Sequence, residues 1–505
     1  MRKAIFSAAA VLLLVTLGAS PAAAVDKVDS KKLRDAVTVN GILGHERALQ
    51  RIANQNGGTR ASGTPGYAAS ATYVKNTLKA AGYQVTEQEF TFPFFRELAP
   101  ATLARLTPTP ATYEAVTYTF SGSGDVTGAV VPTTDVLVPP PATPGSTSGC
   151  EATDFPPAGT APAIALIQRG TCTFNIKVTN AVAAGYDAAI IFNEGQEGRT
   201  EIFAGDLGGV FTIPVVGVDY ATGAALYTAT QAGPVTARVT ASTSTDLNAK
   251  TTNVLAETPG GDPEKVLVVG SHLDSVLEGP GINDNGSGTA TNLEIAEQLA
   301  ALKVKPRQKV RFAFWGAEES GLLGSEHYVE TLPDAELTKI FANLNFDMLG
   351  SPNYVRFVYD GDGSDTPLAG PPGSAEIETI FTDYFAAQGL ATEPTEFNGR
   401  SDYGPFIAVG IPAGGLFSGA EGEKTVEQAQ VYGGVAGQAY DVCYHAACDT
   451  INNLNPKALA ELGDGAAHAV YTLAKTKTGF FPDGSLRAAA PAAPEFAYKG
   501  SHAIR

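Results

Sequence analysis

The chain has 505 residues, more than one ordinary domain needs, and this length favours about three domains. Hydrophobic residues make up 44% of it and charged residues 17%, so the chain can bury a large core and is not disordered. Its formal net charge of −18 argues against a nucleic-acid partner, because phosphates would be repelled, and we attribute the charge to solubility outside the cell.

The first residues have the pattern of a secretory signal peptide. Arg2 and Lys3 precede an apolar run over residues 4–17, and small residues offer a cleavage site after Ala24. The run is too short for a stable membrane anchor, and no other stretch is apolar enough to span a bilayer. We therefore expect residues 1–24 to be removed and the protein to be secreted to the extracellular space.

A capped helix is the first predicted element of the mature chain. Thr64 is its expected N-cap, Pro65 lies in its first turn, and Gly82 ends it. One face is apolar and contains Tyr67, Ala71, Val74, Leu78 and Ala81. A strand-like stretch follows over residues 83–92.

Residues 111–241 differ in composition from the rest, since Pro, Gly, Thr and Val dominate. Short apolar strands flank one helix, and the stretch IALIQRGTCTFNIKVTNAVAAGYDAAIIFNE closely resembles the protease-associated domain, a small α/β module inserted into several peptidases. The match includes Arg169, Gly170, Cys172, Phe174 and Lys177. In its relatives that module carries no chemistry of its own.

Strands and helices alternate after Asp246. The stretch KVLVVGSHLDS is an unbroken apolar run, typical of a strand buried on both faces. A helix over about residues 288–302 and the strands KVRFAFWG, ANLNFDMLG and VRFVYDG follow, and a further helix ends at Gly389. This alternation predicts a doubly wound α/β sheet whose site lies beyond the carboxyl ends of its strands. The tail at residues 484–505 is rich in Ala and Pro and is expected to be mobile.

Four cysteines suit an oxidising compartment and allow three pairings. Proximity favours Cys150 with Cys172 and Cys443 with Cys448, each inside one structural unit. A thiolate zinc site at Cys443 and His445 is the alternative, but a local disulfide fits an exported chain better.

Metal-binding side chains gather where the predicted strands end. They are His272, Asp274, Asp284, Glu318, Glu319, Asp347 and His445. Each has an ordinary alternative: a strand-end histidine is often only a satisfied polar group, Asp284 could form an Asx turn, and Glu318 with Glu319 could open a helix. None of these alternatives explains why acids and histidines follow one apolar strand after another.

Two histidines and three carboxylates are ligands that Zn²⁺ accepts. Five such residues suit two metal ions that share one carboxylate. Asp274 stands two residues after His272 on a strand and so points to the same side. We therefore expect Asp274 to accept the imidazole N–H of His272.

The motifs SHLDS, GINDNGSG, WGAEESGLLGS, NFDMLG, GRSDYGPF, GGLFSGAE and CYHAACDT together closely resemble the secreted bacterial aminopeptidases with two co-catalytic zincs. The resemblance covers about residues 43–475, interrupted by the insert. It implies a zinc-exopeptidase fold, with a mixed, mostly parallel central sheet flanked by helices. Residues 25–110 would then be the N-terminal part of the peptidase domain, and residues 242–483 the catalytic part.

The resemblance also implies metal ligands. His272 and Asp347 would hold one zinc, Glu319 and His445 the other, and Asp284 would bridge the two. No ligand position departs from the family pattern.

Further roles follow from the same resemblance. Glu318 would be the general base and Asp274 the partner of His272. The Tyr444 hydroxyl would stabilise the oxyanion, and Arg400 and Phe417 would lie near the substrate.

The sequence therefore predicts a secreted zinc aminopeptidase that acts on peptides with a free N-terminus. Its preference for large apolar residues such as leucine comes from the resemblance alone. A zinc carboxypeptidase or dipeptidase of the same clan is the main alternative, because these enzymes use nearly the same ligands. A non-catalytic binding ectodomain is a further alternative, against which the full ligand set argues. No feature of the sequence indicates an oligomeric state.

Overall fold

The computed structural model describes residues 27–477, 479–480 and 485. The predicted signal peptide (1–24) and nearly all of the predicted tail (484–505) lie outside these residues. Among the described residues, no helix combines the length and the apolar character needed to cross a bilayer.

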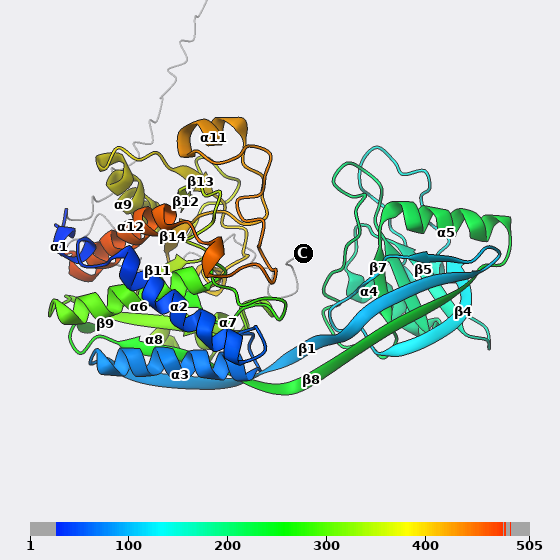
Figure 1. Cartoon of the computed structure of the whole chain (residues 1–505), viewed down its shortest axis with the longest axis horizontal. Helices are drawn as coiled ribbons and strands as arrows, with labels where there is room; N and C mark the ends of the chain where they lie inside the picture. The colour runs from blue at the N-terminus through cyan, green and yellow to red at the C-terminus, as the bar shows by residue number, and fades with distance from the viewer. Residues whose placement is uncertain (1–26, 478, 481–484, 486–505) are drawn as a thin grey trace, which may run out of the picture.

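Two lobes make up the molecule, and two long strands join them (Figure 1). The strands are β1 (Gln84–Thr107) and β8 (Thr236–Glu257), which pair antiparallel along most of their length. We call residues 95–245 the insert lobe and the rest the larger lobe. Residues 111–241, the sequence-predicted insert, all lie in the insert lobe.

One mixed sheet of 14 strands runs through both lobes, in the order β13-β12-β14-β11-β9-β10-β8-β4-β5-β6-β7-β3, with β1 paired to β8 and β2 paired to β1. The remaining strands are β2 (Ala111–Tyr113), β3 (Val116–Thr117), β4 (Gly124–Pro132), β5 (Ala163–Gln168), β6 (Ala188–Phe192), β7 (Val215–Val218), β9 (Asp262–His272), β10 (Gln308–Trp315), β11 (Ile340–Phe346), β12 (Phe357–Tyr359), β13 (Glu393–Thr395) and β14 (Ala413–Phe417). In the larger lobe β10, β9, β11 and β14 are parallel neighbours. The structure thus confirms the predicted mixed, mostly parallel sheet.

Helices cover both faces of this sheet in the larger lobe. The helices of the described residues are α1 (Lys31–Arg34), α2 (Val39–Gln55), α3 (Pro65–Ala80), α4 (Phe174–Ala183), α5 (Tyr220–Ala232), α6 (Gly286–Ala301), α7 (Leu323–Thr331), α8 (Asp334–Leu337), α9 (Ser374–Ala387), α10 (Gly404–Ala408), α11 (Val426–Tyr432) and α12 (Pro456–Lys475), with 3₁₀ turns η1 (Ala152–Asp154) and η2 (Ile451–Asn453). Helix α3 begins as predicted, because the Thr64 side chain accepts the Tyr67 N–H and Pro65 is the first residue.

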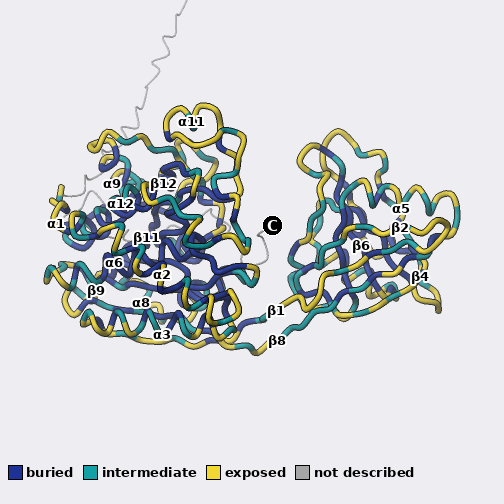
Figure 2. Tube along the Cα trace, in the orientation of Figure 1, coloured by how far each residue is buried: buried dark blue, intermediate teal, exposed yellow. Residues whose placement is uncertain are grey.

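Strand β9 shows why its sequence is an unbroken apolar run. Leu267 and Val269 pack into the core formed with α2, α3, α6, α9 and α12, whereas Val266 and Val268 pack into a second core with residues of α7 and α10. Both faces of the strand are therefore buried, as expected for a parallel sheet between two helical layers. Figure 2 shows this buried interior and a separate one in the insert lobe.

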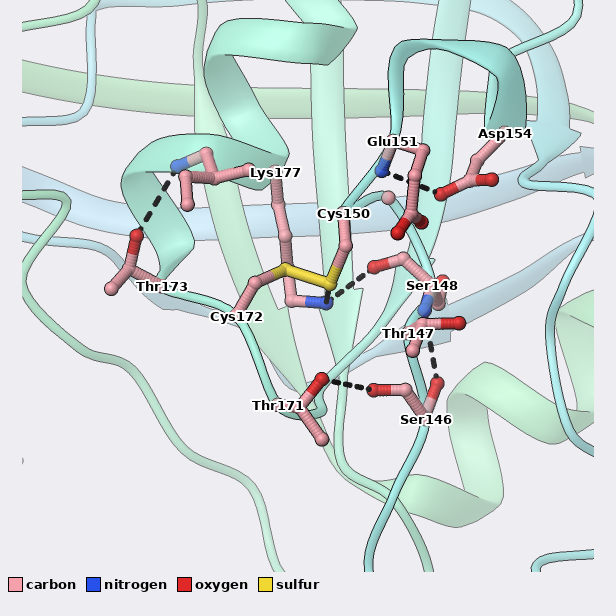
Figure 3. Close-up of a disulfide and its surroundings, with 12 residues drawn as sticks. Ser146, Thr147, Ser148, Cys150, Glu151, Asp154, Thr171, Cys172, Thr173 and Lys177 are labelled. Atoms are coloured by element: carbon pink, nitrogen blue, oxygen red, sulfur yellow. Dashed lines mark hydrogen bonds between the residues drawn. A yellow bond between two sulfur atoms is a disulfide. The ribbon is translucent and has the colours of Figure 1, made fainter.

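The insert lobe has its own cores, built on β4, β5, β6 and β7 and covered by α4 and α5. The structure pairs Cys150 with Cys172 there, and Figure 3 shows the buried Lys177 ammonium beside this disulfide, donating to the Ser148 carbonyl. Burial lowers the pKa of Lys177 to about 8. The lobe is therefore an independently packed unit joined to the rest of the chain through β1 and β8.

Candidate metal centre and active site

The carboxyl ends of adjacent parallel strands carry the candidate site. His272 is the last residue of β9, Glu318 and Glu319 follow β10, and Asp347 follows β11. Asp284 precedes α6, which packs against these strands. Because parallel strands end at one edge of a sheet, residues far apart in the sequence meet here.

Asp284 lies between the two histidines. Its Oδ1 is 3.2 Å from Nε2 of His272, and its Oδ2 is 3.2 Å from Nε2 of His445. The two oxygens of one carboxylate thus face two different imidazoles, which is the arrangement that a bridging ligand requires.

A second carboxylate accompanies each imidazole. Asp347 Oδ1 is 3.3 Å from Nε2 of His272, and Glu319 Oε2 is 3.1 Å from Nε2 of His445. Two groups that share Asp284 result, namely His272 with Asp284 and Asp347, and His445 with Asp284 and Glu319.

These distances fit metal ions better than direct hydrogen bonds. Bond lengths of about 2.0–2.2 Å to a tetrahedral zinc place two ligand atoms roughly 3.3 Å apart, whereas a charge-assisted hydrogen bond would be about 2.7–2.9 Å long. In addition, Oε1 of Glu319 is buried without a hydrogen-bond partner in the described part of the chain. The residues present therefore fit a pair of zinc ions.

The electrostatics of the site also favour cations. Burial lowers the pKa of His445, but Glu319 and Asp284 outweigh this effect and raise it to about 10. Burial likewise opposes protonation of His272, yet Glu318, Asp347 and Asp284 raise its pKa well above the usual value. So much buried negative charge is costly unless a positive charge compensates it.

Glu318 is buried beside these ligands but stands further from them. Its Oε2 is 3.9 Å from Nε2 of His272, beyond hydrogen-bond distance. Burial raises the pKa of Glu318 well above the usual value for a carboxyl group. The two adjacent glutamates thus have different surroundings, because Glu319 faces His445 and Glu318 faces the cavity next to His272.

Asp274 differs from its sequence-based expectation. The atom nearest to Nδ1 of His272 is the backbone carbonyl oxygen of Asp274, at 3.2 Å, and the Asp274 carboxylate is 3.8 Å away. Instead, this carboxylate accepts the backbone N–H of Glu318 at 3.2 Å. Burial raises the pKa of Asp274 to about 7.

Tyr444 and His445 lie in a short turn closed by the Cys443–Cys448 disulfide. Their rings stack with centroids 3.8 Å apart, and the Tyr444 hydroxyl is 3.3 Å from the Arg400 guanidinium. The guanidinium of Arg400 also donates to Glu421 at 2.6 Å.

A cavity of about 620 Å³ contains all the predicted ligands together with Asp274, Glu318, Arg400, Phe417 and Tyr444. Phe417 ends β14, stacks on Phe357 with ring centroids 5.9 Å apart, and lies near Tyr440. These rings give the cavity an apolar side next to the carboxylates. Cys150 and Cys172 lie apart from it, in the insert lobe.

Three supporting residues were missed in the sequence. Ser401 donates to Asp347 Oδ2 at 2.6 Å, and Asp449 accepts the Asp284 N–H at 3.0 Å. The fully buried Arg60 donates to the carbonyl oxygens of Leu273, Pro280 and Gly281, in the loop between His272 and Asp284. Of these three residues, only Ser401 and Asp449 could have been identified from the sequence, because they lie within the GRSDYGPF and CYHAACDT motifs.

Comparison with known proteins decides the family. Residues 253–470 match Peptidase family M28, and residues 126–226 match the PA domain. An aminopeptidase of Pseudomonas aeruginosa is 50% identical over 431 residues, which are 83% of this chain and 78% of that protein. The chain belongs to peptidase family M28. A probable leucine aminopeptidase 2 of Aspergillus fumigatus is 44% identical over 409 residues, 80% of this chain and 77% of that protein.

Solved structures agree with this family. An aminopeptidase from Aneurinibacillus sp. strain AM-1 has a TM-score of 0.69 at 26% identity, covering 88% of this chain and 96% of that one. A zinc aminopeptidase from Bacillus subtilis has a TM-score of 0.64 at 25% identity, covering 89% and 99%. The sequence-based interpretation as a metallo-aminopeptidase with an inserted protease-associated domain is confirmed.

Proposed function

We propose that this protein is an exported aminopeptidase that binds two Zn²⁺ ions and removes N-terminal residues, leucine among them, from peptides. The observation that carries the proposal is the position of Asp284, whose two carboxylate oxygens each lie 3.2 Å from a different imidazole. In this proposal His272 and Asp347 hold one zinc, Glu319 and His445 hold the other, and Asp284 bridges them.

Bound zinc supplies an acidified water and polarises the scissile carbonyl. Glu318 would accept a proton from the attacking water and pass it to the leaving amine, as a buried carboxylate that binds no metal can do. Asp274 fixes Glu318 by accepting its backbone N–H. The Tyr444 hydroxyl donates to the oxygen that becomes negative, with Arg400 beside it.

The substrate class follows from the cavity. Its carboxylates favour a cationic α-ammonium group, and the rings of Phe357, Phe417 and Tyr440 offer an apolar surface for the first side chain. The leucine aminopeptidase named above among the relatives supports the same preference. A carboxypeptidase would need a cation beside the metals for the substrate carboxylate, and Arg400, which contacts Tyr444 there, is already paired with Glu421.

Export and domain organisation belong to the proposal. The predicted signal peptide ends at Ala24, and both disulfides suit an oxidising compartment. We assign residues 111–241 to the protease-associated insert, and residues 25–110 and 242–483 to the peptidase domain.

The test compares leucine p-nitroanilide with N-acetyl-leucine p-nitroanilide and with an N-blocked peptide that has a free C-terminus. The proposal expects turnover of the first substrate only, and close to two zinc ions per chain by elemental analysis. Chelation should abolish turnover and added zinc should restore it. Full activity of a metal-free preparation, or a preference for the N-blocked peptide, would contradict the proposal.

A further inference from the structure

The cavity at the metal centre extends to the insert lobe. Beyond the candidate ligands it is lined by residues 93–97 of β1, of which 95–97 belong to the insert lobe, and by Thr119, Phe120 and Asp206 of the same lobe. Its volume of about 620 Å³ falls in the range of roughly 300–1,000 Å³ that is usual for small-ligand sites. A peptide whose N-terminus lies at the metals therefore has room to continue toward the insert lobe.

Phe120 lines the cavity on the side of the insert lobe, and its backbone conformation is unusual. Its φ of 67° is left-handed, which is costly for a bulky residue and often marks a functional position. The Phe120 carbonyl accepts the Phe211 N–H at 3.0 Å, and its ring meets the ring of Phe95 edge-on with centroids 5.8 Å apart. The fold thus holds an aromatic pair at the cavity.

Arg96 lies beside this pair and is exposed. Its guanidinium has no hydrogen-bond or ion-pair partner among the described residues. The neighbouring Glu97 does not pair with Arg96; its Oε1 instead accepts the Thr117 hydroxyl and the Ala101 N–H. Arg400 also lines the cavity but is paired with Glu421. Arg96 is therefore free to bind an anion in the cavity.

We propose that Phe95, Arg96 and Phe120 bind the part of the substrate on the C-terminal side of the scissile bond. The two rings pack against an apolar side chain, and Arg96 pairs with a carboxylate. That carboxylate is either the C-terminus of a short peptide or an acidic side chain of a longer one. The inference rests on the proposed aminopeptidase function, since that function fixes the peptide direction.

The experiment measures kcat/KM for leucine release from peptides Leu-(Ala)n, with n from one to five, as free acids and as C-terminal amides. A second series of amides carries Glu or Gln at each position after the first. We expect the wild type to prefer the carboxylate form at one peptide length or one Glu position. In Arg96→Gln this acid-to-amide or Glu-to-Gln ratio should fall about fivefold, as for a partly exposed ion pair. Arg96→Lys should retain most of the ratio.

Arg105→Gln is the matched control, because Arg105 is on the same strand and outside the cavity. Phe120→Gly removes the ring but suits the left-handed backbone, so weaker binding of long peptides in this variant cannot come from a strained turn. Equal ratios in the wild type and Arg96→Gln, or the same fall in Arg105→Gln, would overturn the inference. Failure of the wild type to release leucine from any substrate would overturn the proposed function itself.

Discussion

The carboxylate of Asp274 accepts the backbone N–H of Glu318 at 3.2 Å. Two strand ends are joined by this bond, since Asp274 follows β9 and Glu318 follows β10. One residue therefore places the candidate base relative to the candidate ligand His272.

Variants of Asp274 distinguish the effect of its hydrogen bond to Glu318 from the effect of its negative charge. Asp274→Ala should reduce turnover about 10–100-fold, as does the loss of supporting residues around metal sites. Asp274→Asn should lose less, because its amide oxygen can still accept the Glu318 N–H. Steady-state kinetics at saturating zinc measures both. Equal losses in the two variants would mean that the charge, and not the hydrogen bond, is what matters.

The two adjacent glutamates should respond differently to substitution. Glu318→Gln should keep both metals, because no ligand is lost, and its turnover should fall by at least about 10²–10⁴-fold. Glu319→Gln should bind one zinc more weakly, because a neutral amide is a poorer ligand than a carboxylate. Metal content and turnover across a zinc titration distinguish them: excess zinc should partly restore Glu319→Gln only. Rescue of Glu318→Gln by zinc would reverse the assignment.

The disulfide between Cys443 and Cys448 should matter more for the placement of Tyr444 and His445 than for the stability of the fold. It spans 5 residues, against 22 for Cys150–Cys172. The chain-entropy contribution is therefore smaller, about 2 against about 3 kcal/mol. Replacing Cys443 and Cys448 by Ser should weaken zinc binding, since His445 and Tyr444 lie between them.

The control replaces Cys150 and Cys172 by Ser. This variant should unfold at lower denaturant concentration than the wild type, with unchanged zinc affinity. Zinc titration and urea unfolding of both double variants check the contrast. Identical zinc affinities in the two variants would contradict a positional role for the smaller loop.

His45 should make stability depend on pH. Its Nε2 is 3.2 Å from Glu297 and 3.7 Å from Glu294. Burial lowers the pKa of His45, but these two carboxylates outweigh burial and raise it above the usual value. The stabilisation is therefore complete below the unfolded-state pKa of about 6.5 and is lost as pH rises through the higher folded-state pKa.

Comparison of His45→Gln with the wild type tests this dependence. The variant should lower the free energy of unfolding by about 1 kcal/mol at pH 5.5 and by less at pH 9. Urea unfolding at both pH values, at one fixed zinc concentration, gives the two differences. A difference that grows with pH would contradict the assignment.

The candidate ligands could be predicted because their signal is local. Apolar strands are easy to identify, and parallel strands bring their carboxyl ends together, so His272 and Asp347 had to lie close to each other. Arg60 could not be predicted, since it binds carbonyl oxygens more than 200 positions away and no pattern near it marks this role.

The full length of β1 could not be predicted from the sequence either. The sequence predicts a strand over residues 83–92, whereas β1 extends from Gln84 to Thr107. Pro93 and Pro100 interrupt the strand signal, and the pairing with β8 shifts register next to both. Prolines are tolerated at such irregularities because no ladder hydrogen bond from their nitrogen is needed there.

The hydroxyl of Tyr444 was expected near the substrate, but its contact with Arg400 emerges only from the three-dimensional structure.

Strand β8 belongs to both lobes, pairing with β10 near the metal centre and with β4 in the insert lobe. Strands β1 and β8 pair along most of their length despite the irregularities at the prolines, so their pairing sets the distance between the two ends of the cavity. Adding two residues to both β1 and β8 in the stretch between the lobes would lengthen the paired strands by about 7 Å and keep every side chain on its own face. The distance between the candidate metal centre and the peptide-binding residues proposed in the insert lobe is thus set by the pairing of two strands that carry no catalytic residue.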